Sequence, residues 1–252
     1  MLRKTLLAAS FVLAGIGQAN AALTTAGDIA FTAFNADEDG WALATFVDIA
    51  ANTVVFFTDN EWDGSAFNTG EGYHRWVSGA SQINAGAVIR FSKIDSATLL
   101  AASAGTLTRE SVASSTNYGM SQTADTLYAF LGASATSPGT FLAAISSGDF
   151  GTAADGKLDN TGLAVGVSAI ELFNSSDYAE YNGVRSGQAS FGAYMPLVAN
   201  IANWNDLHDG SFAANVPNTT AFTVTPVPVP AALPLLLSGL GLVGVARRRR
   251  TA

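Results

Sequence analysis

The chain contains no cysteine, only two histidines and few charged residues. Of its 252 residues, 13% are charged and 48% are hydrophobic. The absence of cysteine excludes disulfides, thiolate metal sites and cysteine nucleophiles, so an apolar core must hold the fold together. Low charge combined with high hydrophobicity also argues against intrinsic disorder.

Basic side chains are scarce in the body of the chain and gather at its two ends. Arg3, Lys4 and the run from Arg247 to Arg250 make up six of the 12 basic residues, whereas all 20 acidic residues lie between these ends. The body therefore carries a net charge of −14. Such a body repels phosphate backbones, so we expect no nucleic-acid partner; cations, neutral polymers or other proteins suit it better.

Residues 1–21 have the pattern of a secretory signal peptide. Arg3 and Lys4 precede an apolar run from Thr5 to Gly17, and the segment closes on Ala19-Asn20-Ala21. We expect the Sec translocon to export the chain and signal peptidase to cleave after Ala21. The alternative is an uncleaved N-terminal anchor, which is disfavoured because the apolar run falls short of the ~20 residues that a span needs.

The C-terminal tail combines a proline-containing motif, an apolar segment and a basic cluster. Residues 230–246 carry no charge and as a helix would span roughly 25 Å, close to a ~30 Å hydrocarbon core once arginine side chains reach the headgroups. Moving four arginines across would cost on the order of 2.5–3.5 kcal/mol each, so the cluster stops transfer and leaves the body outside. The motif is Val227-Pro228-Val229-Pro230-Ala231, and the cluster is Arg247, Arg248, Arg249 and Arg250.

This three-part tail resembles the PEP-CTERM sorting signal, in its VPLPA variant, which is found on exported proteins of Gram-negative bacteria that make extracellular polysaccharide. The resemblance covers Val227 to Arg250. It implies processing by an exosortase-like transpeptidase in the inner membrane. Val229 stands where the family carries Glu or Leu, which leaves the exosortase class open. A C-terminal anchor that is never cut is the alternative.

Short apolar runs between the two ends predict a mainly β body. They are rich in Val, Ile, Phe and Thr and are separated by Gly, Asn and Asp, a spacing typical of an antiparallel sandwich or barrel. Alternation places Ile29, Phe31 and Ala33 on one face of a strand, and Val55 and Phe57 on one face of another. The predicted strands are residues 28–34, 42–47, 53–58, 74–77, 87–92 and 163–173.

One segment departs from this pattern. Apolar residues recur at helical spacing between Ala189 and Trp204 and predict a short amphipathic helix on the sandwich. Because Pro196 lies inside it, the helix should be kinked or should begin near Tyr194 with the proline in its first turn. Residues 125–132 fit a helix or a strand equally well.

Several short segments of the body resemble bacterial exported domains related to the lamin tail. This resemblance implies an immunoglobulin-like β-sandwich that binds or adheres rather than catalyses. The segments are 27–31, 56–62, 70–72 with Trp76, 125–130, and 181–183 with Asn203-Trp204. The expected organisation is a signal peptide (1–21), a β-sandwich domain (22–222), a proline-rich spacer (223–229), a transmembrane helix (230–246) and a cytoplasmic basic tail (247–252).

Catalysis by histidine has little support in the sequence. His74 lies in an apparent strand and His208 in a turn-like acidic stretch, and no G-x-S-x-G motif accompanies either. We therefore expect no catalytic residues and a protein that is not an enzyme. The alternative is a secreted polysaccharide hydrolase that uses paired carboxylates, whose separation the sequence does not define.

Two acidic loops place oxygen-bearing side chains at alternate positions before a glycine, as calcium loops do. One contains Asp37 and Asp39, the other Asp59 and Asp63. Neither has an acid where an EF-hand carries its bidentate Glu, and Asp, Asn and Gly also make tight turns. Turn formation is the simpler interpretation, so we expect no cofactor and keep calcium as the alternative.

Four tryptophans raise the question of sugar binding, because exposed indole rings stack on sugars whereas buried ones fill cores. Trp62, among the acids of its loop, is the candidate glycan contact. The sequence thus predicts an exported protein, anchored in the inner membrane with its body in the periplasm and then moved to the cell surface or extracellular matrix. Its expected role is structural, adhesive or exopolysaccharide-binding.

Overall fold

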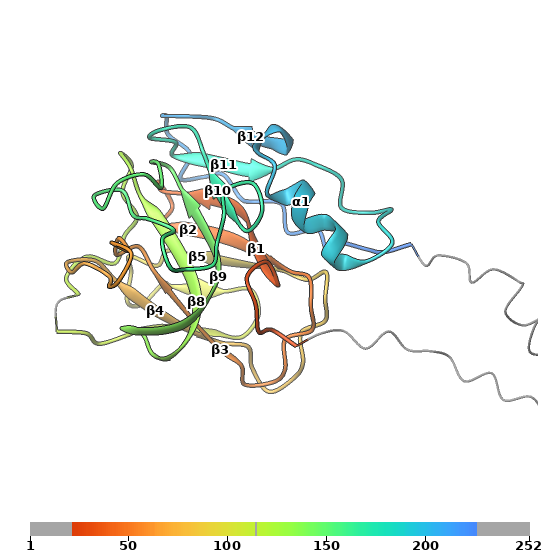
Figure 1. Cartoon of the computed structure of the whole chain (residues 1–252), viewed down its shortest axis with the longest axis horizontal. Coiled ribbons are helices and arrows are strands. Elements are labelled where there is room, and N and C mark those ends of the chain that lie inside the picture. The colour runs from red at the N-terminus through yellow and green to blue at the C-terminus, as the bar shows by residue number, and fades with distance from the viewer. Residues whose placement is uncertain (1–21, 114, 226–252) are drawn as a thin grey trace, which may run out of the picture.

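The computed structural model describes residues 22–113 and 115–225, which form a two-layer β-sandwich (Figure 1). The predicted signal peptide and the tail from Pro226 onward, including the sorting motif and its arginines, lie outside these residues. Within the described part of the chain, no helix is both long and apolar enough to cross a membrane.

Each layer is a six-stranded sheet. Sheet 1 has the order β12-β11-β1-β2-β5-β6, and sheet 2 has the order β10-β9-β8-β3-β4-β7. All pairings are antiparallel except that of β9 with β10, which is parallel. The strands of sheet 1 are β1 (Ile29–Asn35), β2 (Gly40–Thr45), β5 (Val88–Ser92), β6 (Ala101–Ala102), β11 (Tyr178–Tyr181) and β12 (Trp204–Asp206). Those of sheet 2 are β3 (Val54–Thr58), β4 (Tyr73–Val77), β7 (Thr106–Arg109), β8 (Thr126–Ser134), β9 (Ser137–Ser146) and β10 (Ala169–Glu171).

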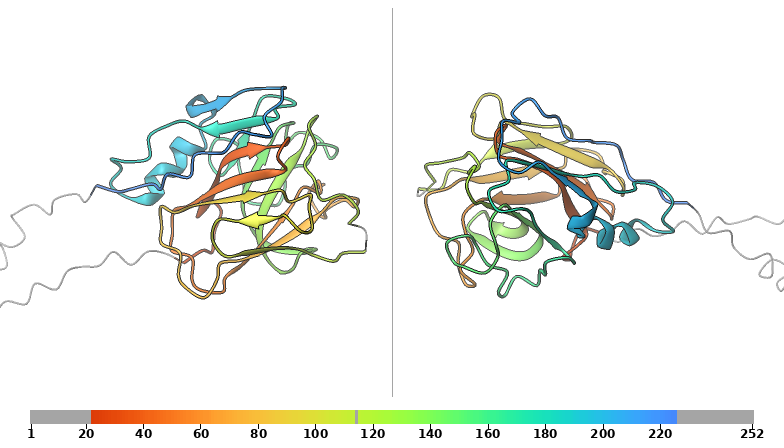
Figure 2. Two further views of the ribbon diagram at one scale, coloured as in Figure 1. Left: turned by 180° about the vertical axis from the view of Figure 1, so that it is seen from behind. Right: turned by 90° about the horizontal axis from the view of Figure 1, so that it is seen from above.

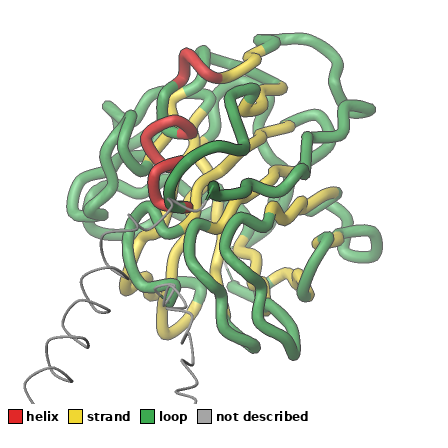
Figure 3. Tube along the Cα trace, turned by 90° about the vertical axis from the view of Figure 1, so that its right-hand side faces the viewer, coloured by secondary structure: helices red, strands yellow, loops and turns green. Residues whose placement is uncertain are grey.

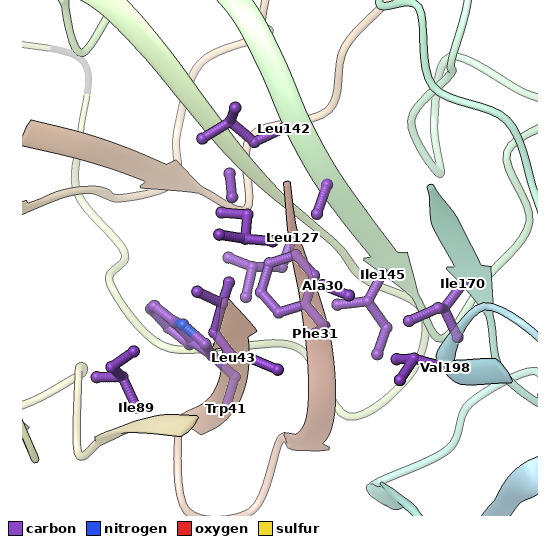
Figure 4. Packing of buried hydrophobic residues seen from close by; sticks show 14 of the residues in the cluster. Ala30, Phe31, Trp41, Leu43, Ile89, Leu127, Leu142, Ile145, Ile170 and Val198 are labelled. Carbon is purple, nitrogen blue, oxygen red and sulfur yellow. The ribbon is translucent and has the colours of Figure 1, made fainter. Parts of the chain in front are cut away.

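The main core lies between the two sheets, and its side chains come from both (Figure 4). Phe31, Leu43 and Ile89 from sheet 1 face Leu127 and Ile145 from sheet 2. The predicted mainly β class is therefore confirmed, and the expected alternation holds in β3, where the side chains of alternate residues enter this core.

One expected face is wrong, because β1 is irregular. Ile29 and Phe31 pack in the core between the sheets, but the pairing of β1 with β2 shifts between Phe31 and Ala33. A bulge of this kind reverses the side-chain alternation beyond it. Phe34 consequently enters the core in the place expected for Ala33.

A second apolar cluster covers the outer face of sheet 2. Phe56, Tyr128, Phe130 and Phe141 point away from the main core and are capped by Trp62 from the β3–β4 loop. An outer face this apolar must be covered to exclude water. Much of the chain is loop (Figure 3), and long loops fold back over the sheets to cover it.

The predicted helical segment is confirmed as three short pieces at one end of the sandwich (Figures 1 and 3). The 3₁₀ helix η1 (Phe191–Tyr194) leads into α1 (Met195–Val198), and η2 (Ile201–Asn203) follows. Tyr194 is the N-cap of α1 and Pro196 lies in its first turn, as expected. Residues 125–132, which fitted a helix or a strand, belong mostly to strand β8. The strand predicted over 163–173 is wrong for most of its length: only β10 forms there, because the chain turns before it and the backbone of residues 167–169 bonds to the Ala164 carbonyl.

The body continues to Thr225, slightly further than its predicted end at 222. Phe222 is buried in the main core, and Thr223 and Thr225 donate backbone hydrogen bonds of 2.8 and 2.9 Å to the carbonyls of Arg185 and Gln188. The Tyr194 hydroxyl adds a 2.5 Å hydrogen bond to the Thr223 carbonyl. Residues 223–225, expected to begin the spacer, are therefore attached to the sandwich.

Candidate functional site

The loop between β3 and β4, residues 59–72, folds back on itself as a small hairpin. Asp63 makes its turn, because its Oδ1 accepts hydrogen bonds from the backbone of Ser65 (2.7 Å) and Ala66 (2.8 Å). Gly64 in this turn has φ +104°, a conformation that favours glycine. Trp62 and Phe67 pair across the hairpin, with ring centroids 5.1 Å apart. The hairpin thus covers part of the apolar outer face of sheet 2.

A segment distant in the sequence ties this hairpin down. The Trp62 carbonyl accepts a 2.8 Å hydrogen bond from the Lys157 backbone, and the Trp62 indole donates one of 2.8 Å to the Asp159 carbonyl. The Asn160 amide reaches the Gly64 carbonyl at 2.8 Å. Three contacts to residues 157–160 therefore fix the orientation of the Trp62 ring.

An open groove of about 450 Å³ lies between this hairpin and the β8–β9 turn. Three aromatic residues, Trp62, Phe67 and Tyr73, contribute to it, and exposed hydroxyl and amide side chains surround them. We call it the Trp62 groove; its lining residues are Trp62, Ser65, Ala66, Phe67, Asn68, Thr69, Tyr73, Thr136, Ser137 and Pro138. No acidic or basic side chain is among them.

Trp62 is buried and is therefore not the exposed stacking residue that a glycan contact requires. It is only 7% exposed and packs against Phe141, with ring centroids 5.1 Å apart. Trp62 is therefore chiefly a core residue, the alternative that the sequence left open. Phe67, whose ring packs on the same cluster, is the more accessible aromatic residue of the groove.

Comparison of the chain with protein-family models, with curated proteins and with solved structures gave no match. Arguments about function therefore rest on the residues of the chain and on the geometry of the fold.

Three of the four calcium candidates act as ordinary hydrogen-bond acceptors. Asp63 lies on the exposed hairpin turn, where hydrogen bonds from the Ala66 and Ser65 backbone and the Ser65 hydroxyl lower its pKa. Asp37 accepts from the side chain of Gln122, and Asp39 accepts a 2.7 Å bond from the Met120 backbone. Burial raises the pKa of Asp39 to about 6, despite that backbone bond.

Asp37 and Asp39 lie together in the β1–β2 turn, whereas Asp59 and Asp63 do not share a site. Asp59 points inward beneath the β3–β4 loop and is 2% exposed, but Asp63 faces solvent. Among residues 22–113 and 115–225, no three histidine, aspartate or glutamate side chains are already arranged to hold a metal ion.

A different acidic cluster forms at one end of sheet 2. Asp59 directly follows β3, Glu71 lies two residues before β4, and Asp125 directly precedes β8. Since β3 is antiparallel to both neighbours, its C-terminal end lies beside their N-terminal ends, and the three carboxyl groups are brought together. We call these residues the buried acid cluster.

The surroundings of the buried acid cluster disfavour the ionised form of its three carboxyl groups. Burial, followed by the negative charges of Asp125 and Glu71, raises the pKa of Asp59 well above its usual range. Burial, with Asp125 and Glu61 adding to it, raises the pKa of Glu71 to about 8. Burial also raises the pKa of Asp125, against two backbone hydrogen bonds that lower it. The sequence could not reveal this cluster, because Asp125 is far from the other two along the chain.

Neither histidine has the surroundings of a catalytic base. His74 is buried and its Nε2 lies 3.3 Å from the Ile94 carbonyl. Nδ1 of His208 lies 3.6 Å from Oδ1 of Asp206. That oxygen also accepts a 2.6 Å hydrogen bond from the Ser176 hydroxyl. In a hydrolytic triad the histidine stands between hydroxyl and carboxylate. Here the carboxylate stands in the middle, so His208 has no hydroxyl to activate in this group.

A smaller cleft of about 370 Å³, which we call the carboxylate cleft, has three carboxylates in its lining. Asp149, Asp155 and Glu171 line it together with Asn174, and no aromatic side chain is among its lining residues. Asp149 and Asp155 accept hydrogen bonds from Gly151 and Thr152 within their own loop. This cleft is the place where the carboxylate-hydrolase alternative would find its acids.

Proposed function

We propose that this chain is an exported cell-surface or extracellular-matrix protein that is sorted through its C-terminal signal and that binds a neutral polysaccharide without cleaving it. Export is supported by residues 1–21, and sorting by the motif from Val227 to Ala231 and the arginines that end the tail. On this proposal the partners are the Sec translocon, signal peptidase, the inner membrane and an exosortase-like transpeptidase.

The Trp62 groove is the observation that carries the binding role. Sugars present apolar ring faces and many hydroxyl groups, so they suit a surface of aromatic carbons next to neutral polar side chains. The groove offers the half-buried ring of Phe67 and the exposed hydroxyls of Thr69 and Ser137. Its lining lacks carboxylates, which supports binding over hydrolysis.

The placement of the loop also suits a surface role. The β3–β4 loop, drawn in orange, lies at the end of the molecule away from Ala22 and Thr225 (Figures 1 and 2). A tail that anchors the chain beyond Thr225 would therefore leave this loop facing outward. For the fold we propose the finer class implied by the lamin-tail resemblance, an immunoglobulin-like sandwich; the two packed sheets are compatible with it.

Affinity electrophoresis of the full chain, purified in a detergent without a sugar headgroup, tests the binding role. We expect laminarin or dextran, both neutral, to retard the protein, and alginate to fail because its carboxylates meet a body of net charge −14. Ser137→Trp fills the groove from an exposed position and should weaken retardation at least ten-fold. Ala97→Trp, exposed and outside the groove, is the matched control.

Two outcomes would overturn this proposal. Equal retardation of Ser137→Trp and Ala97→Trp would exclude the groove, and new reducing ends in the incubated polysaccharide would favour the hydrolase. In the second case, Asp149→Asn, Asp155→Asn and Glu171→Gln should identify the acids of the carboxylate cleft.

Mass spectrometry of the native protein tests sorting separately. We expect a mature C-terminus that has lost the arginine cluster. A mature form that retains Arg250 would contradict exosortase processing and support an uncut anchor.

A further inference from the structure

The buried acid cluster holds charge for which the described structure offers no basic partner. The groups that act electrostatically on Glu71 are the acids Asp125 and Glu61. The strongest charges acting on Asp59 are likewise those of Asp125 and Glu71. Burying several carboxyl groups without a cation is costly, so such groups either keep their protons or bind a positive ion.

Two oxygen atoms of the cluster are buried and have no hydrogen-bond partner. They are Oδ2 of Asp59 and Oε2 of Glu71. The other oxygen of Asp59 accepts a 3.2 Å bond from the Gly72 backbone, which holds the side chain in place beneath the loop. An unpaired acceptor on a side chain that is only 2% exposed is rare and requires an explanation.

Hydrogen bonds from the backbone hold the carboxyl groups of Asp59 and Asp125 in place, whereas the carboxyl group of Glu71 has none among the described residues. Both oxygens of Asp125 accept backbone bonds, from Thr126 at 2.7 Å and from Ser121 at 2.6 Å. Glu71 is only half-buried, and no hydrogen bond within the described residues engages its carboxyl group. The cluster therefore combines two carboxyl groups that the backbone holds with a third whose buried oxygen has no hydrogen-bond donor.

We propose that Asp59, Glu71 and Asp125 form a binding site for a divalent cation, calcium, which the unpaired buried oxygens of Asp59 and Glu71 would ligate. Oxygen-only ligands select hard cations, and calcium accepts the irregular geometry that carboxylates from three separate segments provide, whereas magnesium demands a near-ideal octahedron. This ligand set differs from both loops that the sequence singled out, since it takes only Asp59 from them. It is independent of sugar binding in the Trp62 groove.

Such an ion would join the ends of three strands. Asp59, Glu71 and Asp125 flank β3, β4 and β8, so the cation would neutralise their repulsion and fix the base of the β3–β4 loop. The site should therefore respond to calcium through stability rather than through chemistry.

Thermal melts and isothermal titration calorimetry of the full chain, first stripped with EDTA and kept at pH 8, test the proposal with calcium chloride as the probe. We expect a dissociation constant of about 0.1–1 mM, as for extracellular calcium modules. The melting temperature should rise by about 3–6 °C at ten times that concentration. Magnesium chloride should give a smaller shift.

Isosteric variants locate the site. Asp59→Asn and Glu71→Gln should each weaken calcium binding at least ten-fold and abolish the melting shift. Both should melt at or above the temperature of the stripped wild type, because they remove an unpaired buried charge. Asp209→Asn, at an exposed acid outside both the cluster and the carboxylate cleft, should keep the full response.

Three results would overturn the proposal. One is the absence of calorimetric heat and melting shift up to about 10 mM calcium, well above the range of such sites. Another is an unchanged calcium response in both Asp59→Asn and Glu71→Gln. An equal response to magnesium would overturn the assignment to calcium.

Discussion

His74 lies in β4 with 1% of its surface exposed, between the rings of Trp41 and Tyr118. Burial lowers its pKa to about 4, and the positive charge of Arg109 adds to this effect against the hydrogen bond to Ile94. The ring is therefore neutral in the folded protein at pH 7 and serves as an aromatic core residue with one polar contact.

This burial predicts a specific loss of stability in acid. Because the pKa of His74 is depressed by folding, its contribution is complete above about pH 6.5 and is lost as the pH falls through about 4. Relative to His74→Phe, the wild type should lose about 2–3 kcal/mol of unfolding free energy between pH 7 and pH 4. Urea titrations at a series of pH values measure the difference. Parallel curves for wild type and His74→Phe would show that the ring is not buried in its neutral form.

At the scale of elements, the turn that enters β7 depends on one glycine. Gly105 has φ +76°, and a Cβ there would lie 2.3 Å from the Val77 carbonyl oxygen and 2.6 Å from the Trp76 indole nitrogen. That indole donates a 2.8 Å bond to the neighbouring Ala104 carbonyl. The close approach lets β7 pair with β4 and complete the edge of sheet 2.

Gly105→Ala should destabilise the protein by about 2–4 kcal/mol, because the added methyl group meets backbone in a conformation unfavourable for alanine. Chemical denaturation measures the loss, and a change in the Trp76 indole NMR signal should accompany it. Gly192→Ala is the control, since its Cβ would meet nothing within 4 Å. Similar stabilities for the two variants would contradict the proposed role of Gly105.

At the scale of the whole molecule, aromatic side chains join the two sheets. Phe57 from sheet 2 contacts Trp41 and Phe91 from sheet 1, with ring centroids 5.1 Å away in both cases. All three side chains are fully buried. With no disulfide available, we expect this contact to couple the unfolding of the two layers.

Phe57→Ala should therefore cost about 3–5 kcal/mol and weaken both sheets together. Hydrogen exchange should show protection falling in β2 as well as in β8, although the substitution lies in β3. Phe173→Ala, at a position that is 61% exposed, should change stability by no more than about 0.5 kcal/mol. Loss of protection confined to sheet 2 would show that the layers are held together elsewhere.

Much of the strand content was predictable from local pattern, because alternating apolar residues and turn formers act over a few neighbours. Runs such as 53–58 and 87–92 became β3 and β5 with small changes at their ends. Strand β9 was missed, since Ser137-Pro138-Gly139 at its start looks like a turn. The bulge in β1 was missed because it depends on pairing with β2.

The candidate sites divide in the same way. The sequence pointed to the loop around Trp62 and to Asp59 within it, but not to the groove or to the cluster with Glu71 and Asp125. Which strands pair depends on contacts between residues far apart in the chain, and no local pattern encodes that choice.

By itself, the sequence determined the chemistry available to this protein: no thiols, an acidic body, two ends in which basic residues adjoin apolar segments, and short apolar runs separated by turn-forming residues. Only the tertiary structure decided which side chains are buried and which meet. Burial turns Trp62 from a surface candidate into a packed residue, and strand pairing gathers three distant carboxyl groups in one place. Both depend on how the sheets pack, because exposure and proximity belong to the folded chain and not to any single segment.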